Sequence, residues 1–162
     1  GLERATGQLV PLQVSGLGEN SCTTCYSDDA PRSYWRVALD LRWSDDQRAR
    51  SYLQLPSQLR QSVQQQGALR GIYAHDGTAL SNELNVVGNA GALAALLTTD
   101  PALANSLYAR AFIGGASTGN GAVYWGDPND LRAQAWAWYA SALYDNLLPD
   151  IWHRPDAASK EK

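Results

Sequence analysis

Helical segments that are apolar on most of their faces alternate along this chain with segments that are polar or amphipathic. A helix without a polar face is stable only when it is surrounded by protein, whereas a polar helix must contact solvent. The alternation therefore predicts two layers, with inner helices covered by outer ones, as in an α/α toroid built from helix hairpins. The expected fold class is all-α, and five helices make up only part of such a ring. The expected order is apolar over 32–43, polar over 45–66, apolar over 84–97, amphipathic over 102–112 and apolar over 128–148.

Short polar residues, prolines and glycines mark the expected ends of these helices. Asp29 precedes the first apolar helix and Asp127 precedes the last one, and each can accept hydrogen bonds from the free N–H groups of a first helical turn. Pro56 is expected to kink or interrupt the long polar helix, because proline has no N–H group to donate. The Gly-rich stretch 113–122 is expected to be a loop.

Composition places the chain among ordinary globular domains and excludes two classes of partner. A chain of 162 residues, 44% of them hydrophobic, is long enough for one domain with a core. Its net charge of −3 is not that of a nucleic-acid-binding surface, and no apolar run is long enough to span a bilayer. No signal peptide is expected within this chain, but a mature secreted protein would have the same composition.

The two cysteines, Cys22 and Cys25, form a single C-T-T-C motif. A structural zinc site needs four ligands, and the two histidines, His75 and His153, lie far away in the sequence. A redox motif is expected at the start of a helix that follows a strand, whereas this motif lies in a stretch rich in Ser, Thr and Gly. Ordinary loop cysteines, a local disulfide and metal or redox chemistry stay open as interpretations, and no cofactor or metal site is assigned.

The stretch CYSDDAPRSYWR, residues 25–36, combines two adjacent aspartates with arginines and aromatic side chains. Taken alone, the sequence favours helix capping for Asp28 and Asp29. Arginine and aromatic side chains close by would also suit a sugar site, because aromatic faces stack on sugar rings. The chain has six Trp and eight Tyr but only one Phe, which favours the same chemistry, although most of these side chains are expected in the core.

Residues 29–53, DAPRSYWRVALDLRWSDDQRARSYL, resemble the D-A-x-R-x-P-W-R-[IV]-A-x-D motif of glycoside hydrolase family 8. Three further stretches resemble segments of that family and occur in its order: TGQLVP at 6–11, GIYAHDGTALSNE at 71–83 and AVYWGDPNDLRAQAWAW at 122–138. The resemblance implies that residues 1–152 are the C-terminal half of an endo-β-1,4-glucanase domain with an (α/α)6 barrel. Residues 153–162 are expected to be a disordered tail.

The resemblance implies that Asp29 is the general base of an inverting hydrolysis. The general acid of the family is a Glu in the N-terminal half, which this chain does not include. An inverting enzyme holds its two carboxyl groups roughly 6.5–9.5 Å apart, so that a water molecule fits between the base and the sugar. Arg32, one helical turn after Asp29, would help to keep the base ionised. The four glutamates of the chain match no motif of the family: Glu3, Glu19, Glu83 and Glu161.

Four residues are candidates for substrate binding: Arg32, Tyr124, Trp125 and Tyr26. Tyr124 and Trp125 follow the Gly-rich stretch and precede the start of a helix, which is where an α/α barrel of this family builds its cleft. Asp127 is expected mainly to cap that helix. Three other tryptophans are expected in the core: Trp35, Trp136 and Trp138.

Two functions therefore compete. The first is hydrolysis of β-1,4-glucan by a secreted or periplasmic bacterial enzyme, in which the partner of this chain is the missing N-terminal half of the barrel. The alternative is a catalytically incomplete helical module that binds glucan or a protein. Cellulose, mixed-linkage glucan, chitosan and xylan all stay open as substrates. A half-barrel is expected to expose the apolar faces that its missing half would cover.

Overall fold

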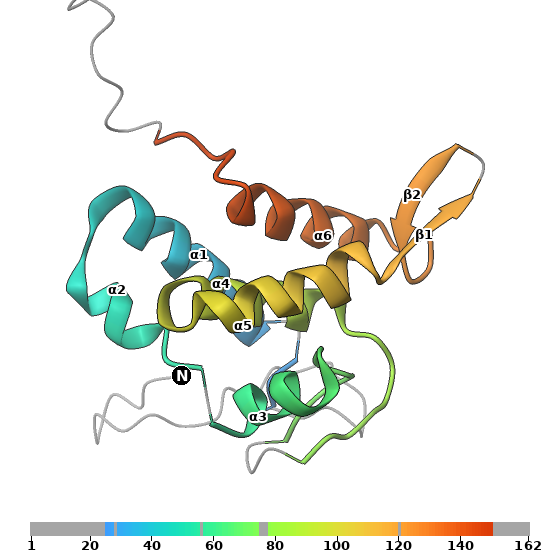
Figure 1. Ribbon diagram of the computed structural model, residues 1–162, viewed down its shortest axis with the longest axis horizontal. Helices are drawn as coiled ribbons and strands as arrows, with labels where there is room; N and C mark the ends of the chain where they lie inside the picture. The colour runs from blue at the N-terminus through green and yellow to red at the C-terminus, as the bar shows by residue number, and fades with distance from the viewer. Residues whose placement is uncertain (1–24, 28, 56, 75–77, 120, 151–162) are drawn as a thin grey trace, which may run out of the picture.

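The computed structural model describes residues 25–27, 29–55, 57–74, 78–119 and 121–150, and within them the chain is mostly helical (Figure 1). A two-stranded antiparallel hairpin, in which Ala116 pairs with Trp125, accompanies the helices. The helical prediction is confirmed, but the fold is not all-α. The elements are α1 (Asp29–Ser44), α2 (Gln47–Tyr52), α3 (Ser57–Gln66), α4 (Val86–Thr99), α5 (Pro101–Leu107), the π-helical segment η1 (Tyr108–Ile113), β1 (Ala116–Gly119), β2 (Ala122–Trp125) and α6 (Leu131–Tyr144).

Helix α4 is the centre of the domain, and it packs against α1, α5 and α6. Every residue from Val86 to Leu96 is buried, as its apolar sequence predicts. The one buried polar side chain among the described residues is Asn89, whose amide forms two hydrogen bonds with the backbone of Leu69. It accepts from the Leu69 N–H at 2.7 Å and donates to the Leu69 carbonyl at 2.9 Å. The side chain of Asn89 on α4 thereby satisfies both backbone groups of Leu69, a residue in the loop after α3.

Helices α1 and α4 are parallel neighbours. Pro31, in the first turn of α1, lies so close to Gly91 that a Cβ atom at Gly91 would be 2.4 Å from the Pro31 Cα atom. Further along both helices, Leu41 packs in one apolar cluster with Ala94. Pro31 precedes Leu41 in α1, and their neighbours Gly91 and Ala94 follow one another in the same order in α4. The two helices therefore run in the same direction.

Helix α6 runs in this direction too. The indole N–H of Trp35 donates to the carbonyl of Tyr139 at 3.0 Å. About two turns further along α1, Arg42 donates at 2.6 Å to the carbonyl of Leu143, which lies about one turn further along α6. The N-terminal ends of α1, α4 and α6 therefore lie at one end of the domain. In Figure 1, α5 lies against α4 and runs back toward the hairpin and the start of α6.

The polar and amphipathic segments form short helices around this group. The segment predicted as one helix over 45–66, interrupted at Pro56, is two helices, α2 and α3. Helix α3 buries only Leu59 and Val63, and it is tied to the α4–α5 corner by an ion pair between Arg60 and Asp100. Of the three helices expected to be inner ones, α4 is buried along most of its length, whereas α1 buries only Pro31, Ala38 and Leu41, so the two-layer arrangement stays a prediction. The described residues do not form a closed ring, so the complete toroid stays a prediction.

Two local predictions are corrected by the structure. The stretch 113–122 is not a loop throughout, because it contains β1 and the start of β2. The last helix is capped by Asp130, which accepts from the N–H groups of Arg132 and Ala133, both at 3.0 Å. Asp127, the predicted cap, instead accepts from the N–H of Asn129 at 2.8 Å in the preceding turn. The predicted tail, 153–162, lies outside the described residues.

The Asn89 amide should contribute strongly to stability. In Asn89→Ala, the N–H and carbonyl groups of Leu69 lose their partners inside the core, and each such loss costs about 1–3 kcal/mol. We expect the free energy of unfolding, measured by urea denaturation, to fall by about 2–4 kcal/mol. Asn129→Ala, at an exposed turn, is the matched control and should change it by less than about 0.5 kcal/mol. Equal effects of the two substitutions would show that the amide is not a structural requirement.

Candidate functional site

The shared end of α1, α4 and α6 is the part of the domain with the most candidate site residues. Asp29 begins α1, Asn85 caps α4 by accepting from the N–H of Gly88 at 2.7 Å, and Asp130 caps α6. The N-terminal end of a helix carries a partial positive charge that favours carboxylates and other anions. Three such ends point the same way, so this end of the domain stabilises negative charge.

Asp29 lies at the edge of this end, with its carboxylate in solvent. Its side chain is 90% exposed, and Oδ1 is 3.3 Å from Nη1 of Arg32, one turn along the helix. Asp29 is the first residue of α1 and not the residue that precedes it, so it differs from an ordinary N-cap. Its neighbour Asp28 lies outside the described residues. A carboxylate that is both accessible and held by a cation can accept a proton from a bound water.

Arg32 is much less exposed than its partner. Its side chain is 27% exposed, and its guanidinium carbon lies 6.0 Å from the centre of the Trp136 ring on α6. The Nε atom is buried and has no hydrogen-bond partner among the described residues. A buried donor without an acceptor is uncommon in proteins, and it sets Arg32 apart from an ordinary surface arginine.

Trp125, at the end of β2, is held firmly by groups on both sides of it. Its indole N–H donates to the carbonyl of Phe112 at 2.8 Å. Gln134 on α6 accepts from the backbone N–H of Trp125 and donates to its carbonyl, both at 2.9 Å. Tyr124 is its neighbour in the strand, and adjacent strand residues point to opposite faces. The two neighbouring candidates therefore do not share one face of the hairpin.

A cavity of about 480 Å³ opens beside Trp125, between the segment before α4 and the start of α6. It is lined by one aromatic ring, three carboxylates and one guanidinium among other groups, and its volume is that of a small-molecule or sugar site. Tyr124 does not line it. Its charged and aromatic lining residues are Glu83, Trp125, Asp127, Asp130 and Arg132.

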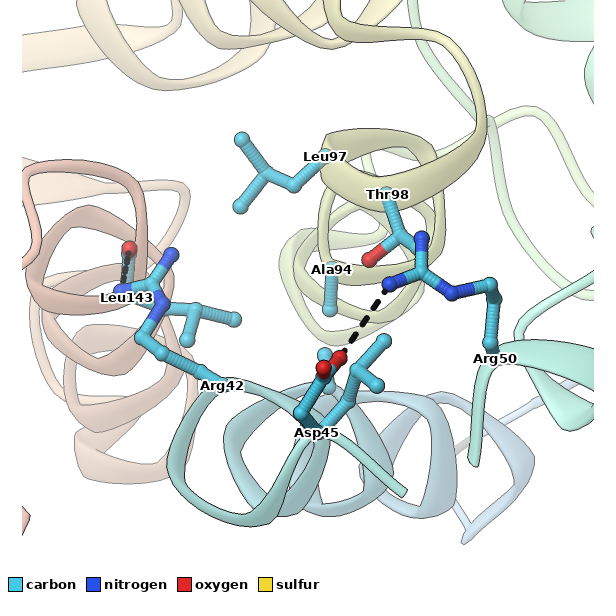
Figure 2. Close-up of a pocket in the computed structure, with 9 residues that line it drawn as sticks. Arg42, Asp45, Arg50, Ala94, Leu97, Thr98 and Leu143 are labelled. Atoms are coloured by element: carbon cyan, nitrogen blue, oxygen red, sulfur yellow. Dashed lines mark hydrogen bonds and ion pairs between the residues drawn. The ribbon is translucent and has the colours of Figure 1, made fainter. Parts of the chain in front are cut away.

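A second cavity, of about 400 Å³, lies at the opposite end, where α1 and α4 finish (Figure 2). Arg42 and Arg50 line it, but each is turned to a partner: Arg42 donates to the carbonyl of Leu143, and Arg50 lies 3.4 Å from Asp45. Burial lowers the pKa of Arg42. Cations near the C-terminal ends of helices offset the negative end of the helix dipole, and this explains both arginines without a ligand.

Tyr26 is removed from the set of substrate-binding candidates. Only 8% of it is exposed, and its hydroxyl donates to the carbonyl of Gly88 at 2.9 Å. Its backbone N–H and carbonyl pair with Tyr73, so the residue belongs to the core. Its position between Cys25 and the expected start of a helix gave no signal in the sequence that Tyr26 would point inward.

The tryptophan predictions are partly right. Trp136 is buried at 8% exposure, and Trp35 is half-buried against it, with ring centres 5.9 Å apart. Trp138 is 59% exposed, so its assignment to the core is wrong. Two other large side chains of α6 are also exposed: Tyr139, next to Trp138, and Leu131, about two turns before it.

The cysteine question is answered in part. Cys25 is disulfide-bonded, while Cys22, like His75, lies outside the described residues. Within the described part of the chain, no group of three or more His, Cys, Asp or Glu side chains could hold a metal ion. No helix found there is both long and apolar enough to cross a membrane.

Comparison of the chain with models of known protein families, with curated proteins and with solved structures finds no match. The candidate site therefore rests on its own geometry. Sequence reasoning had not selected Glu83, Arg132 or Gln134, because they lie within the stretches compared with the family but match none of its characteristic positions. The amide of Gln134, nine residues after Trp125, could be found only from the fold.

Burial raises the pKa of Tyr26 well above that of an ordinary tyrosine, and the nearby Tyr34 and Tyr73 act in the same direction. The folded protein keeps this proton at pH values where the unfolded chain, with a pKa of about 10, has lost it. Stability should therefore be fully present below pH 10 and fall as the pH rises above it. In Tyr26→Phe, the decline between about pH 9 and pH 11 should be shallower in urea denaturation. An unchanged decline would contradict the assignment.

Proposed function

We propose that this chain supplies the general base and part of the sugar cleft of an inverting glycoside hydrolase that acts on β-1,4-glucan. The observation that carries the proposal is the arrangement of Asp29 at the start of α1, where an exposed carboxylate is held 3.3 Å from a largely buried arginine. The resemblance of residues 29–53 to glycoside hydrolase family 8 assigns the base role to the same aspartate.

The proposed step is removal of a proton from water. Asp29 accepts the proton while the water oxygen attacks the anomeric carbon from the face opposite the leaving group. A glutamic acid, supplied from outside this chain, protonates the departing glycosidic oxygen. The ion pair with Arg32 holds the carboxylate of Asp29 at the start of α1, where it can meet a bound water.

The cavity beside Trp125 supports the sugar-binding part of the proposal. It lies at the same end of the parallel helices as Asp29, and the rigidly held indole offers a flat apolar surface. Carboxylates such as Glu83 and Asp127 supply acceptors for sugar hydroxyls around that surface. Tyr124, on the other face of the strand, is half-buried and is not part of this cavity.

The exposed face of α6 supports the proposal that a further part of a barrel covers this chain. Leu131 is 79% exposed and Trp138 is 59% exposed, although both are apolar and lie on one long helix. Such side chains are enriched where proteins bind other surfaces. We assign this face to the N-terminal half of the barrel, in a protein that is secreted or periplasmic.

The base role predicts a large loss of activity on removal of one charge. Asp29→Asn keeps the shape of the side chain but cannot accept the proton, and the rate of carboxymethyl-cellulose hydrolysis by the full-length protein should fall by about 10²–10⁴-fold. Asp40→Asn, an exposed position on the same helix, is the control and should keep the wild-type rate. Full activity in Asp29→Asn would remove Asp29 from the mechanism.

The second candidate function is glucan binding without catalysis, and the cavity beside Trp125 is the observation that favours it. This function predicts no hydrolysis by any form of the protein, but measurable binding of cello-oligosaccharides.

Calorimetric titration tests the cavity as a sugar site under either function. Trp125→Ala should weaken cello-oligosaccharide binding by about five- to thirtyfold, because the loss of an aromatic face costs about 1–2 kcal/mol. Trp125→Phe keeps such a face and should retain most of the affinity. Trp43→Ala, at the opposite end of α1, is the control. If Trp125→Ala binds as tightly as the wild type, sugar does not bind at this cavity.

A further inference from the structure

The ring of Trp136 is held in one orientation by the side chains around it. Trp35 and Tyr139 contact it edge-on, with ring centres at 5.9 Å and 5.5 Å. Trp35 is itself tied to α6, because its indole N–H donates to the Tyr139 carbonyl. Only 8% of Trp136 is exposed, so its ring has little freedom to turn. A rigid aromatic surface therefore faces the start of α1.

Arg32 rests on that surface. Its guanidinium carbon is 6.0 Å from the ring centre, at the outer limit of the range in which an aromatic ring attracts a cation. One end of the guanidinium, Nη1, reaches Asp29. The Nε atom is buried and has no acceptor among the described residues. The ring thus takes the place of water beside a charge that protein atoms only partly satisfy.

This contact matters for Asp29 because little else restrains the carboxylate. Among the described residues its one side-chain partner is Arg32, and its side chain is 90% exposed. Arginine has several rotatable bonds, and an exposed ion pair of this kind is weak unless one partner is fixed. Trp136 supplies that restraint, and it does so from a helix about a hundred residues away in the chain.

We propose that Trp136 is a positioning residue: its ring holds Arg32, so that Nη1 orients the carboxylate of Asp29. The inference rests on the proposed function of Asp29. It goes beyond that function by placing the control of the base on α6, in a side chain that contacts neither the water nor the sugar.

The simplest competing explanation is that Trp136 only fills the core. A core role predicts that Trp136→Leu lowers the melting temperature and that its effect on kcat is independent of Arg32. A positioning role predicts that the two residues act through one another. Removal of either should then have most of the effect of removing both.

A double-mutant cycle on the full-length protein separates these explanations. The variants are Trp136→Leu, Arg32→Gln and the double variant, and kcat and KM for a soluble cello-oligosaccharide are measured for each. We expect Trp136→Leu alone to lower kcat by about three- to tenfold, because it removes the cation–π contact that holds Arg32. In the Arg32→Gln background, the same substitution should lower kcat by less than about twofold.

Two further variants control for packing. Trp136→Phe keeps an aromatic face and should recover most of the lost kcat. Trp43→Leu removes a half-buried tryptophan from the far end of α1, and it should lower the melting temperature while leaving kcat unchanged. Effects of Trp136→Leu and Arg32→Gln that multiply independently, or an unchanged kcat in Trp136→Leu, would overturn the proposal.

A readout without catalysis distinguishes failure of this inference from failure of the proposed function. The Nε–H resonance of Arg32 should be shifted by the Trp136 ring current and exchange slowly with solvent, and both properties should be lost in Trp136→Leu. An unmoved resonance overturns the positioning role even if the enzyme is active. Absence of hydrolysis by the wild type overturns the base role, while the same resonance still reports whether Trp136 holds Arg32.

Discussion

The complete burial of α4 is the constraint on which the rest of the domain depends. A helix whose residues from Val86 to Leu96 are all buried needs protein on every side, and α1, α5 and α6 provide it. Asn89 is the one buried polar side chain among the described residues. Its hydrogen bonds to the backbone of Leu69 and Asn85 offset the free energy lost when its amide leaves water. The close approach of Pro31 to Gly91 then brings the start of α1 against α4.

Helices α1 and α6 pack against α4 and run in the same direction as it does. The candidate site lies at the end of the domain where these three helices begin. Polar helices and the hairpin return the chain to one end before each apolar helix begins, so helix starts that are distant in sequence become neighbours. Asp29 and Trp136 belong to opposite ends of the described chain, yet Arg32 connects them. The second cavity has helix ends of the opposite polarity, and its arginines already have partners.

The sequence predicts those elements that depend on local apolar patterns or on proline. It does not predict those whose position depends on contacts with residues far away in the chain. The buried helix over 84–97 and the break in the polar helix near Pro56 were predictable from composition and proline geometry. The hairpin was missed because Gly, Ser and Thr dominate its first strand, and its second strand depends on Gln134 and Phe112. Trp138 was misplaced because helical periodicity does not say which apolar faces find a partner within this chain.

The exposure of Asp29 and the exposure of α6 have one explanation under the proposed function. A general base works best where water is limited to the reacting molecule, since electrostatic interactions weaken in bulk solvent. The carboxylate of Asp29, at 90% exposure, is surrounded by bulk solvent. The apolar face of α6 at Trp138 is exposed as well. Under that function, the part of the protein that carries the acid stands across the sugar from Asp29, and the proposal assigns the exposed face of α6 to the same part. Under the proposed function, Arg32 and Trp136 would orient the base from within this chain, whether or not that part is in place.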